Sequence, residues 1–76
     1  MKEEVAAEAS KRLWKIHGEL NDLVWVLKER CEDDEFRTFR RRVAAAMAAV
    51  GDVMTAIYRE FPNLEPKTPD DIEKFL

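Results

Sequence analysis

The only histidine, His17, is the first residue to consider for acid–base or metal chemistry. A histidine that acts as a general base or as a metal ligand needs an acidic or nucleophilic partner close by. On a helix, its neighbours three and four positions away are Leu13, Trp14, Leu20 and Asn21, and none of them is acidic or nucleophilic. We therefore expect His17 to hydrogen-bond Asn21 or a partner chain rather than to catalyse a reaction.

The only cysteine, Cys31, is a second candidate for nucleophilic chemistry. It is followed directly by the acidic sequence EDDE. Neighbouring carboxylates disfavour the thiolate, which is the nucleophilic form of the side chain. A lone cysteine also cannot form an internal disulfide. We expect a structural role for Cys31.

Acidic residues at helical spacing could bind a divalent metal. Glu29, Glu32 and Glu35 follow one another at intervals of three residues, but metal sites in helical bundles add Glu-x-x-His motifs from other helices. Further along, only Asp52 and Glu60 precede the proline-containing tail. The chain also has no glycine-rich phosphate loop and no nucleophile motif. We expect no metal, no cofactor, no small-molecule substrate and no enzymatic activity.

One cluster could bind nucleic acid: Arg37, Arg40, Arg41 and Arg42. On a helix these side chains point about 100°, 40°, 140° and 240° away from Phe36, so they form a collar instead of a stripe along a phosphate backbone. The net charge of −3 does not fit a chain built around a polyanion either. Two collars in a dimer could nevertheless form basic ends. A small RNA- or DNA-binding regulator is therefore the alternative function.

Length and composition predict one small helical domain. Seventy-six residues lie near the lower limit for a single core, and 46% hydrophobic with 38% charged residues is a globular composition. Two glycines, and three prolines confined to the last fifteen residues, disfavour an all-β fold. The N-terminus lacks the apolar core of a signal peptide, and no apolar run approaches the ~20 residues of a membrane span. We expect a cytoplasmic protein with no membrane partner.

Two amphipathic helices follow from apolar residues spaced at three and four positions. In the first helix, about residues 2–30, the predicted core row is Val5, Ala9, Leu13, Ile16, Leu20, Leu23 and Leu27, widened by Ala6, Val24 and Cys31. In the second, about residues 35–61, it is Phe36, Phe39, Val43, Met47, Val50, Val53, Met54, Ile57 and Phe61, flanked by Tyr58. Pro62 ends the second helix, because proline lacks the amide donor.

The phase of the two rows predicts a hairpin with a turn at residues 31–34. Leu27 and Phe36 lie at the centres of their rows and are nine residues apart. Nine residues turn about 900°, so an unbroken helix would place the two rows about 180° apart. An antiparallel hairpin lets both rows face inward, with Asp33 or Asp34 as the cap of the second helix.

A second apolar ridge on the first helix predicts assembly. Trp14 and Trp25 are eleven residues apart and so share a face, and the second helix offers small side chains beside its core row. One hairpin cannot bury both ridges, so we expect two hairpins to pair into a homodimeric four-helix bundle. The predicted dimer or partner interface consists of Trp14, His17, Gly18, Asn21, Trp25, Ala44, Ala48, Gly51 and Thr55.

Residues 62–76 form a proline-containing tail with a predicted short helix at about 69–75. Thr68 suits an N-cap and Pro69 the first helical position. Two turns are too short to be stable alone, so the helix must dock through its apolar side chains. These are Ile72, Phe75 and Leu76. If the tail covers the tryptophan ridge of its own chain, the protein is a three-helix monomer instead of a dimer.

Together these observations favour a small non-enzymatic protein-interaction module, an adaptor, inhibitor or assembly factor, that acts as a homodimer with an unidentified protein partner.

Overall fold

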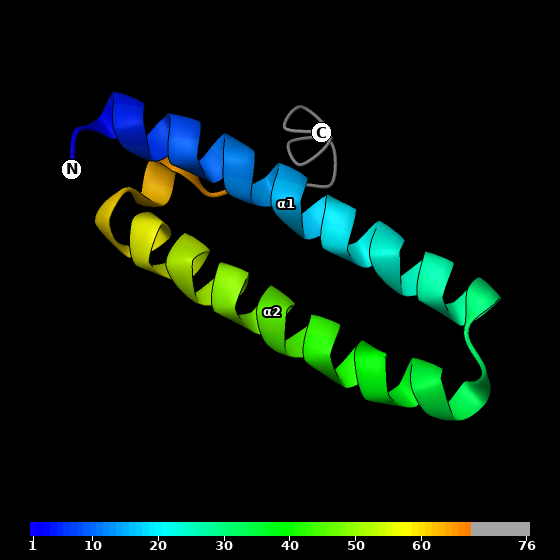
Figure 1. Ribbon diagram of the computed structural model, residues 1–76. Coiled ribbons are helices and arrows are strands. Elements are labelled where there is room, and N and C mark those ends of the chain that lie inside the picture. Colours follow the sequence, from blue (N-terminus) through cyan, green and yellow to red (C-terminus); the bar gives the residue numbers. More distant parts are fainter. Residues whose placement is uncertain (68–76) are drawn as a thin grey trace.

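The computed structural model describes residues 1–67 and shows two long antiparallel helices (Figure 1). These are α1 (Glu3–Arg30) and α2 (Asp33–Glu60), followed by a 3-10 turn, η1 (Pro62–Leu64). Each long helix has 28 residues and is therefore about 42 Å long. The predicted all-helical hairpin is confirmed. The predicted helix at 69–75, with Ile72, Phe75 and Leu76, lies outside the described residues.

The connection between the helices is only two residues long. The backbone of Cys31 is extended, and its N–H still bonds the carbonyl oxygen of Leu27 at 2.9 Å, which closes the last turn of α1. Since α2 begins at Asp33, two residues earlier than predicted, Glu32 occupies the cap position and makes no side-chain cap hydrogen bond. Asp33 and Asp34 are not caps but lie in the first turn, where carboxylates interact favourably with the positive end of the helix dipole.

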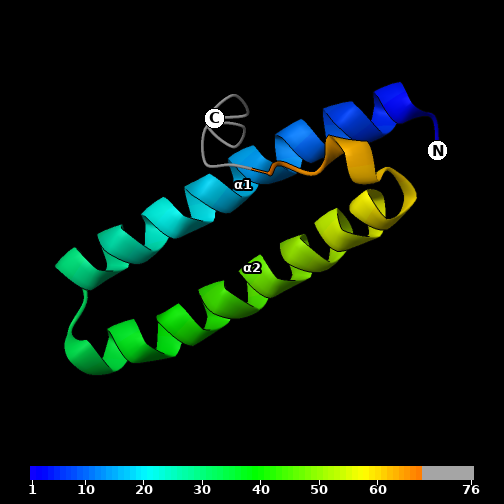
Figure 2. The ribbon, with the colours of Figure 1, turned by 180° about the vertical axis from the view of Figure 1, so that it is seen from behind.

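The open end of the hairpin is closed by the chain that follows α2. The helix ends before Pro62, as the sequence predicts, and Pro62 is the first residue of η1. From η1 to Lys67 the chain lies beside the first half of α1 in both views of the ribbon (Figure 1 and Figure 2). Asn63 donates a hydrogen bond to the Glu3 carboxylate, and the N-terminal ammonium lies 3.5 Å from Glu60 Oε1. The N-terminal end of the chain is thus bonded both to the end of α2 and to η1.

The core is a single narrow seam between the two helices. Its buried members are Ala6 and Ser10 from α1 and Val43, Met54 and Ile57 from α2. Half-buried residues continue the same rows at spacings of three and four: Leu13, His17, Leu20, Val24 and Leu27 on α1 with Cys31 directly after that helix, and Phe36, Met47 and Val50 on α2 with Phe61 directly after that helix. Among the described residues, three large side chains are therefore buried in this seam.

Five residues of the predicted core rows lie outside this seam. Val5, Ile16 and Leu23 on α1 are 51%, 44% and 41% exposed, and Phe39 and Val53 on α2 are 44% and 51% exposed. The prediction that these five face inward is wrong. Each helix carries two adjacent apolar rows, and an antiparallel pair shares only one seam, so one row per helix stays outside.

Small side chains explain which of the two apolar rows of α1 packs against α2. Ala6 and Ser10 are 0% and 1% exposed, and they lie one turn apart in the seam. Small residues let the backbone of a second helix approach, and here they lie against the end of α2 that carries Tyr58. The seam therefore passes through these two positions instead of through Val5 and Ala9.

Candidate interaction surfaces

A cluster of three polar side chains joins the helices near the open end of the hairpin. The Tyr58 hydroxyl accepts a hydrogen bond from Trp14 Nε1 at 2.8 Å and shares a second hydrogen bond with Ser10 Oγ. Because Ser10 is buried, its hydroxyl needs a protein partner. The sequence analysis gave Ser10 no role, although its position in the same row as Ala6 and Leu13 was a usable signal. The cluster fixes which turns of α1 and α2 lie opposite each other.

The residues considered for chemistry are not brought together. His17 is half-buried and packs edge-on against the Trp14 ring, with centroids 5.8 Å apart, and makes no hydrogen bond to Asn21. Cys31 is a half-buried free thiol at the turn. Within residues 1–67, no three His, Cys, Asp or Glu side chains are placed to hold a metal ion. Neither α1 nor α2, the long helices of that same part, is long and apolar enough to cross a membrane.

One broad side of the hairpin, which we call the tryptophan face, carries most of the predicted interface. Trp14, Gly18, Asn21 and Trp25 lie here on α1, and Ala44, Ala48, Gly51 and Thr55 lie here on α2. A Cβ atom added to Gly51 would meet nothing within 4 Å, so the surface beside it is open. The small residues predicted for the interface are therefore accessible.

The two tryptophans of this face have different environments. Trp14 is half-buried, and its N–H donates a hydrogen bond to the Tyr58 hydroxyl. Trp25 is 57% exposed, and its ring is contacted by the Lys28 ammonium 5.1 Å from the centroid. Glu3, which receives the hydrogen bond from Asn63, lies on the same side of α1 as Trp14. The half of the face near the open end is thus partly used by the chain itself, whereas no segment within residues 1–67 covers the Trp25 ring.

The opposite side, which we call the apolar face, is formed by Val5, Ile16, Leu23, Phe39 and Val53. These side chains are rotated about 60–100° from the inward direction, in the same sense on both helices. In an antiparallel pair the same sense of rotation puts them on the same side. Five of the eight most exposed large apolar side chains of the described residues gather here. No other described segment covers them.

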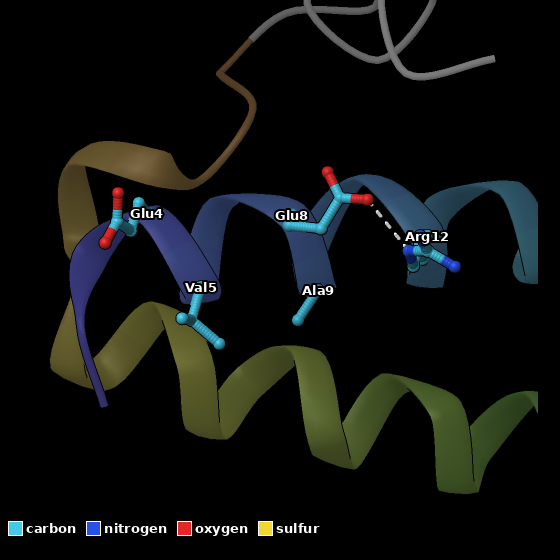
Figure 3. A pocket seen from close by; sticks show the side chains of 5 residues that line it. All are labelled: Glu4, Val5, Glu8, Ala9 and Arg12. Carbon is cyan, nitrogen blue, oxygen red and sulfur yellow. Dashed lines mark hydrogen bonds and ion pairs between the residues drawn. The ribbon is translucent and has the colours of Figure 1, made fainter.

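An open hollow lies at the α1 edge of the apolar face (Figure 3). It is lined by Glu4, Val5, Glu8, Ala9 and Arg12. Val5 and Ala9 point to the side where α2 lies, whereas Glu8 points away from it and accepts a hydrogen bond from Arg12 Nε at 2.8 Å. The hollow therefore has an apolar floor, in which the small side chain of Ala9 leaves space, and a charged rim.

The side chains of the arginine collar are exposed to solvent. The collar consists of Arg37, Arg40, Arg41 and Arg42. Among the described residues no carboxylate lies within ion-pair distance of these guanidinium groups, and the Arg42 guanidinium lies 5.9 Å from the centroid of the Phe39 ring. The cation over Trp25 is Lys28 and not a member of the collar. The collar is available to an anionic partner.

Comparison with protein-family models, with curated proteins and with solved structures finds no match for this chain, so its surfaces are the basis on which function is inferred.

Proposed function

We propose that this chain is a non-enzymatic protein-interaction module, an adaptor, inhibitor or assembly factor, that acts as a homodimer. The observation that supports this proposal is the imbalance between a thin seam and two apolar sides. Among the described residues, the large side chains buried in the seam are only Val43, Met54 and Ile57. Apolar side chains on both broad sides remain exposed. A two-helix unit of this kind is stabilised when a second chain covers such surface.

The polar cluster of the seam supports an architectural role rather than a reaction. The Ser10 hydroxyl and the Trp14 N–H are both hydrogen-bonded to the Tyr58 hydroxyl. Trp25 is different, because a large exposed ring on a rigid helix is the kind of side chain that anchors a protein interface. We assign the half of the tryptophan face that carries Trp25 to the protein partner.

Two measurements test the proposal. Light scattering after size-exclusion chromatography should give twice the 8.9 kDa mass of one chain. Affinity capture from a cell extract should then be compared between the wild type, Trp25→Ala and the matched surface variant Lys11→Ala. A protein retained by the wild type and by Lys11→Ala, but lost with Trp25→Ala, is the expected result. A monomer at every concentration, with no Trp25-dependent capture, would contradict the proposal.

A second function is favoured by the arginine collar alone. Four exposed guanidinium groups that have no carboxylate partner among residues 1–67 are suited to contact phosphates of RNA or DNA. Fluorescence anisotropy with a generic duplex and a stem-loop, at low and at moderate salt, tests this. Binding that weakens steeply with salt and disappears in the Arg41→Glu, Arg42→Glu double variant would support it. Absence of binding at low salt would remove it.

A further inference from the structure

We infer that the second copy of the chain packs on the apolar face, with α1 against α1 and α2 against α2 in antiparallel order. The two-fold axis crosses the hairpin close to Ile16. This inference rests on the proposed homodimer and identifies its interface. It differs from the interface predicted from the sequence, because it leaves Trp25 and the tryptophan face on the outside of the assembly.

The outer row of α1 is complementary to itself. Its members alternate at spacings of four and three, which makes one straight row along a helix: Val5, Ala9, Arg12, Ile16, Glu19, Leu23 and Val26. A two-fold rotation about the middle of the row places each residue opposite one of the second copy. The resulting pairs are Val5 with Val26, Ala9 with Leu23, Arg12 with Glu19, and Ile16 with Ile16 of the second copy. A two-fold interface requires this property, since each patch must fit the same patch on the other chain.

The outer row of α2 is complementary to itself in its middle part. It reads Glu35, Phe39, Arg42, Ala46, Ala49, Val53, Ala56 and Glu60. Ala46 and Ala49 lie on either side of its middle and allow close approach of the two copies, and Phe39 falls opposite Ala56. Arg42 falls opposite Val53, so at this point two large side chains meet. At the far ends Glu35 falls opposite Glu60, a pair of like charges, although the Glu60 carboxylate is already 3.5 Å from the N-terminal ammonium.

The same two-fold axis passes through the middle of the α1 row and the middle of the α2 row. Because the connection has two residues, Arg30 lies at the same height along the hairpin as Asp33. Each step back along α1 from Arg30 is then level with one step forward along α2 from Asp33. Ile16 is then level with residue 47, which lies between Ala46 and Ala49. The middle of the α1 row and the middle of the α2 row are therefore at the same height along the hairpin. The two sequences match this condition independently of each other.

The hollow at the edge of the apolar face provides space for the second copy. Its floor is Val5 and Ala9 and its rim includes Arg12 (Figure 3). In the antiparallel arrangement, Leu23 and Val26 of the second copy arrive at this place. Leu23 is then a large side chain that enters a hole made by Ala9, as in helix pairs with knobs-into-holes packing. Arg12 keeps Glu8 on one side and gains Glu19 of the second copy on the other.

Cysteine cross-linking tests the axis directly. In a Cys31→Ser background, Ile16→Cys puts two thiols next to the two-fold axis, and mild oxidation should convert most of the protein to a disulfide-linked dimer. Trp25→Cys in the same background is the matched control, since its two thiols lie on opposite outer sides and should stay reduced. Cross-linking of Trp25→Cys instead would overturn the inference. So would a dimer in which Ile16→Cys does not react but a Leu23→Cys, Phe39→Cys pair does.

Charge reversal tests the register. Arg12→Glu and Glu19→Arg should each weaken self-association roughly tenfold, because each creates two like-charge contacts across the axis. The double variant should restore wild-type association. Lys11→Glu makes the same charge change as Arg12→Glu on the solvent side of α1 and should have little effect. A dimer whose single variants weaken association without rescue in the double variant refutes this register. A wild-type protein that is monomeric refutes the proposed homodimer itself.

Discussion

Removing the hydroxyl of Tyr58 should destabilise the hairpin although it removes one atom. In Tyr58→Phe the hydroxyl of Ser10, a residue that is 1% exposed, loses the one hydrogen-bond partner that it has among the described residues. An unsatisfied buried polar group costs about 1–3 kcal/mol. The Trp14 N–H also loses its acceptor, but Trp14 is half-buried and water can replace the acceptor. We therefore expect a loss of about 1–3 kcal/mol in the free energy of unfolding.

Urea unfolding followed by circular dichroism measures this loss. With a slope of about 1 kcal/mol per molar urea for a small protein, the midpoint should fall by about 1–3 M. All variants must be compared at one protein concentration, because the stability of a dimer depends on it. A Trp25→Phe background leaves Trp14 as the only tryptophan, so its fluorescence reports the cluster itself.

Two further variants distinguish the loss of the Ser10–Trp14–Tyr58 cluster from the general effect of removing a hydroxyl group. Thr38→Val removes a hydroxyl that bonds the Asp34 carbonyl oxygen on the exposed side of α2, and should change stability by less than about 0.5 kcal/mol. Ser10→Ala combined with Tyr58→Phe removes both partners of the buried bond and should be less destabilising than the sum of the single variants. If Tyr58→Phe costs no more than Thr38→Val, the cluster does not hold the two helices together.

Three other variants probe the seam and the two faces. Ile57→Ala should destabilise by about 2–5 kcal/mol in thermal or urea unfolding, because Ile57 is 5% exposed and the truncation leaves a cavity; an unchanged midpoint would remove it from the core. Gly51→Ala should stabilise by about 0.5–1 kcal/mol, since a Cβ there meets no atom within 4 Å and alanine is the better helix former; a weaker dimer in this variant would instead place the second copy on the tryptophan face. Trp25→Glu should stay folded and dimeric by circular dichroism and light scattering, because the side chain is 57% exposed; a partly unfolded monomer would show that Trp25 is buried in the assembly.

The helices and their reversal could be predicted from the sequence, because both depend on local signals. The spacing of apolar residues sets each helix, and the phase between Leu27 and Phe36 excludes a continuous one. The start of α2 was predicted two residues late, since a cap at Asp33 or Asp34 is only one way to begin a helix. Three carboxylates in the first turn stabilise the earlier start through the helix dipole.

The choice between two adjacent apolar rows could not be made from one helix at a time. Val5 and Ile16 are more hydrophobic than Ala6 and Ser10, yet the small pair lies in the seam. What decides is how closely the other helix can approach, and that is a property of the pair. The Ser10–Tyr58 bond was missed for the same reason, because its partners are 48 residues apart in the chain. Trp25, by contrast, lies on the face that the sequence analysis assigned to it.

The short connection between the helices implies that this chain can exchange helices between copies. Cys31 and Glu32 have φ angles of −101° and −65°, and the described residues include no backbone angle that demands glycine. Both residues can therefore adopt other backbone angles without strain. The reversal is imposed by contacts along the seam, because no feature of the turn itself enforces it. Weakening the seam should thus favour an opened chain in which Cys31 and Glu32 stay non-helical and the two helices pair with those of another molecule, a domain swap. A continuous helix through the turn would not allow this exchange, because it would place the two apolar rows on opposite faces.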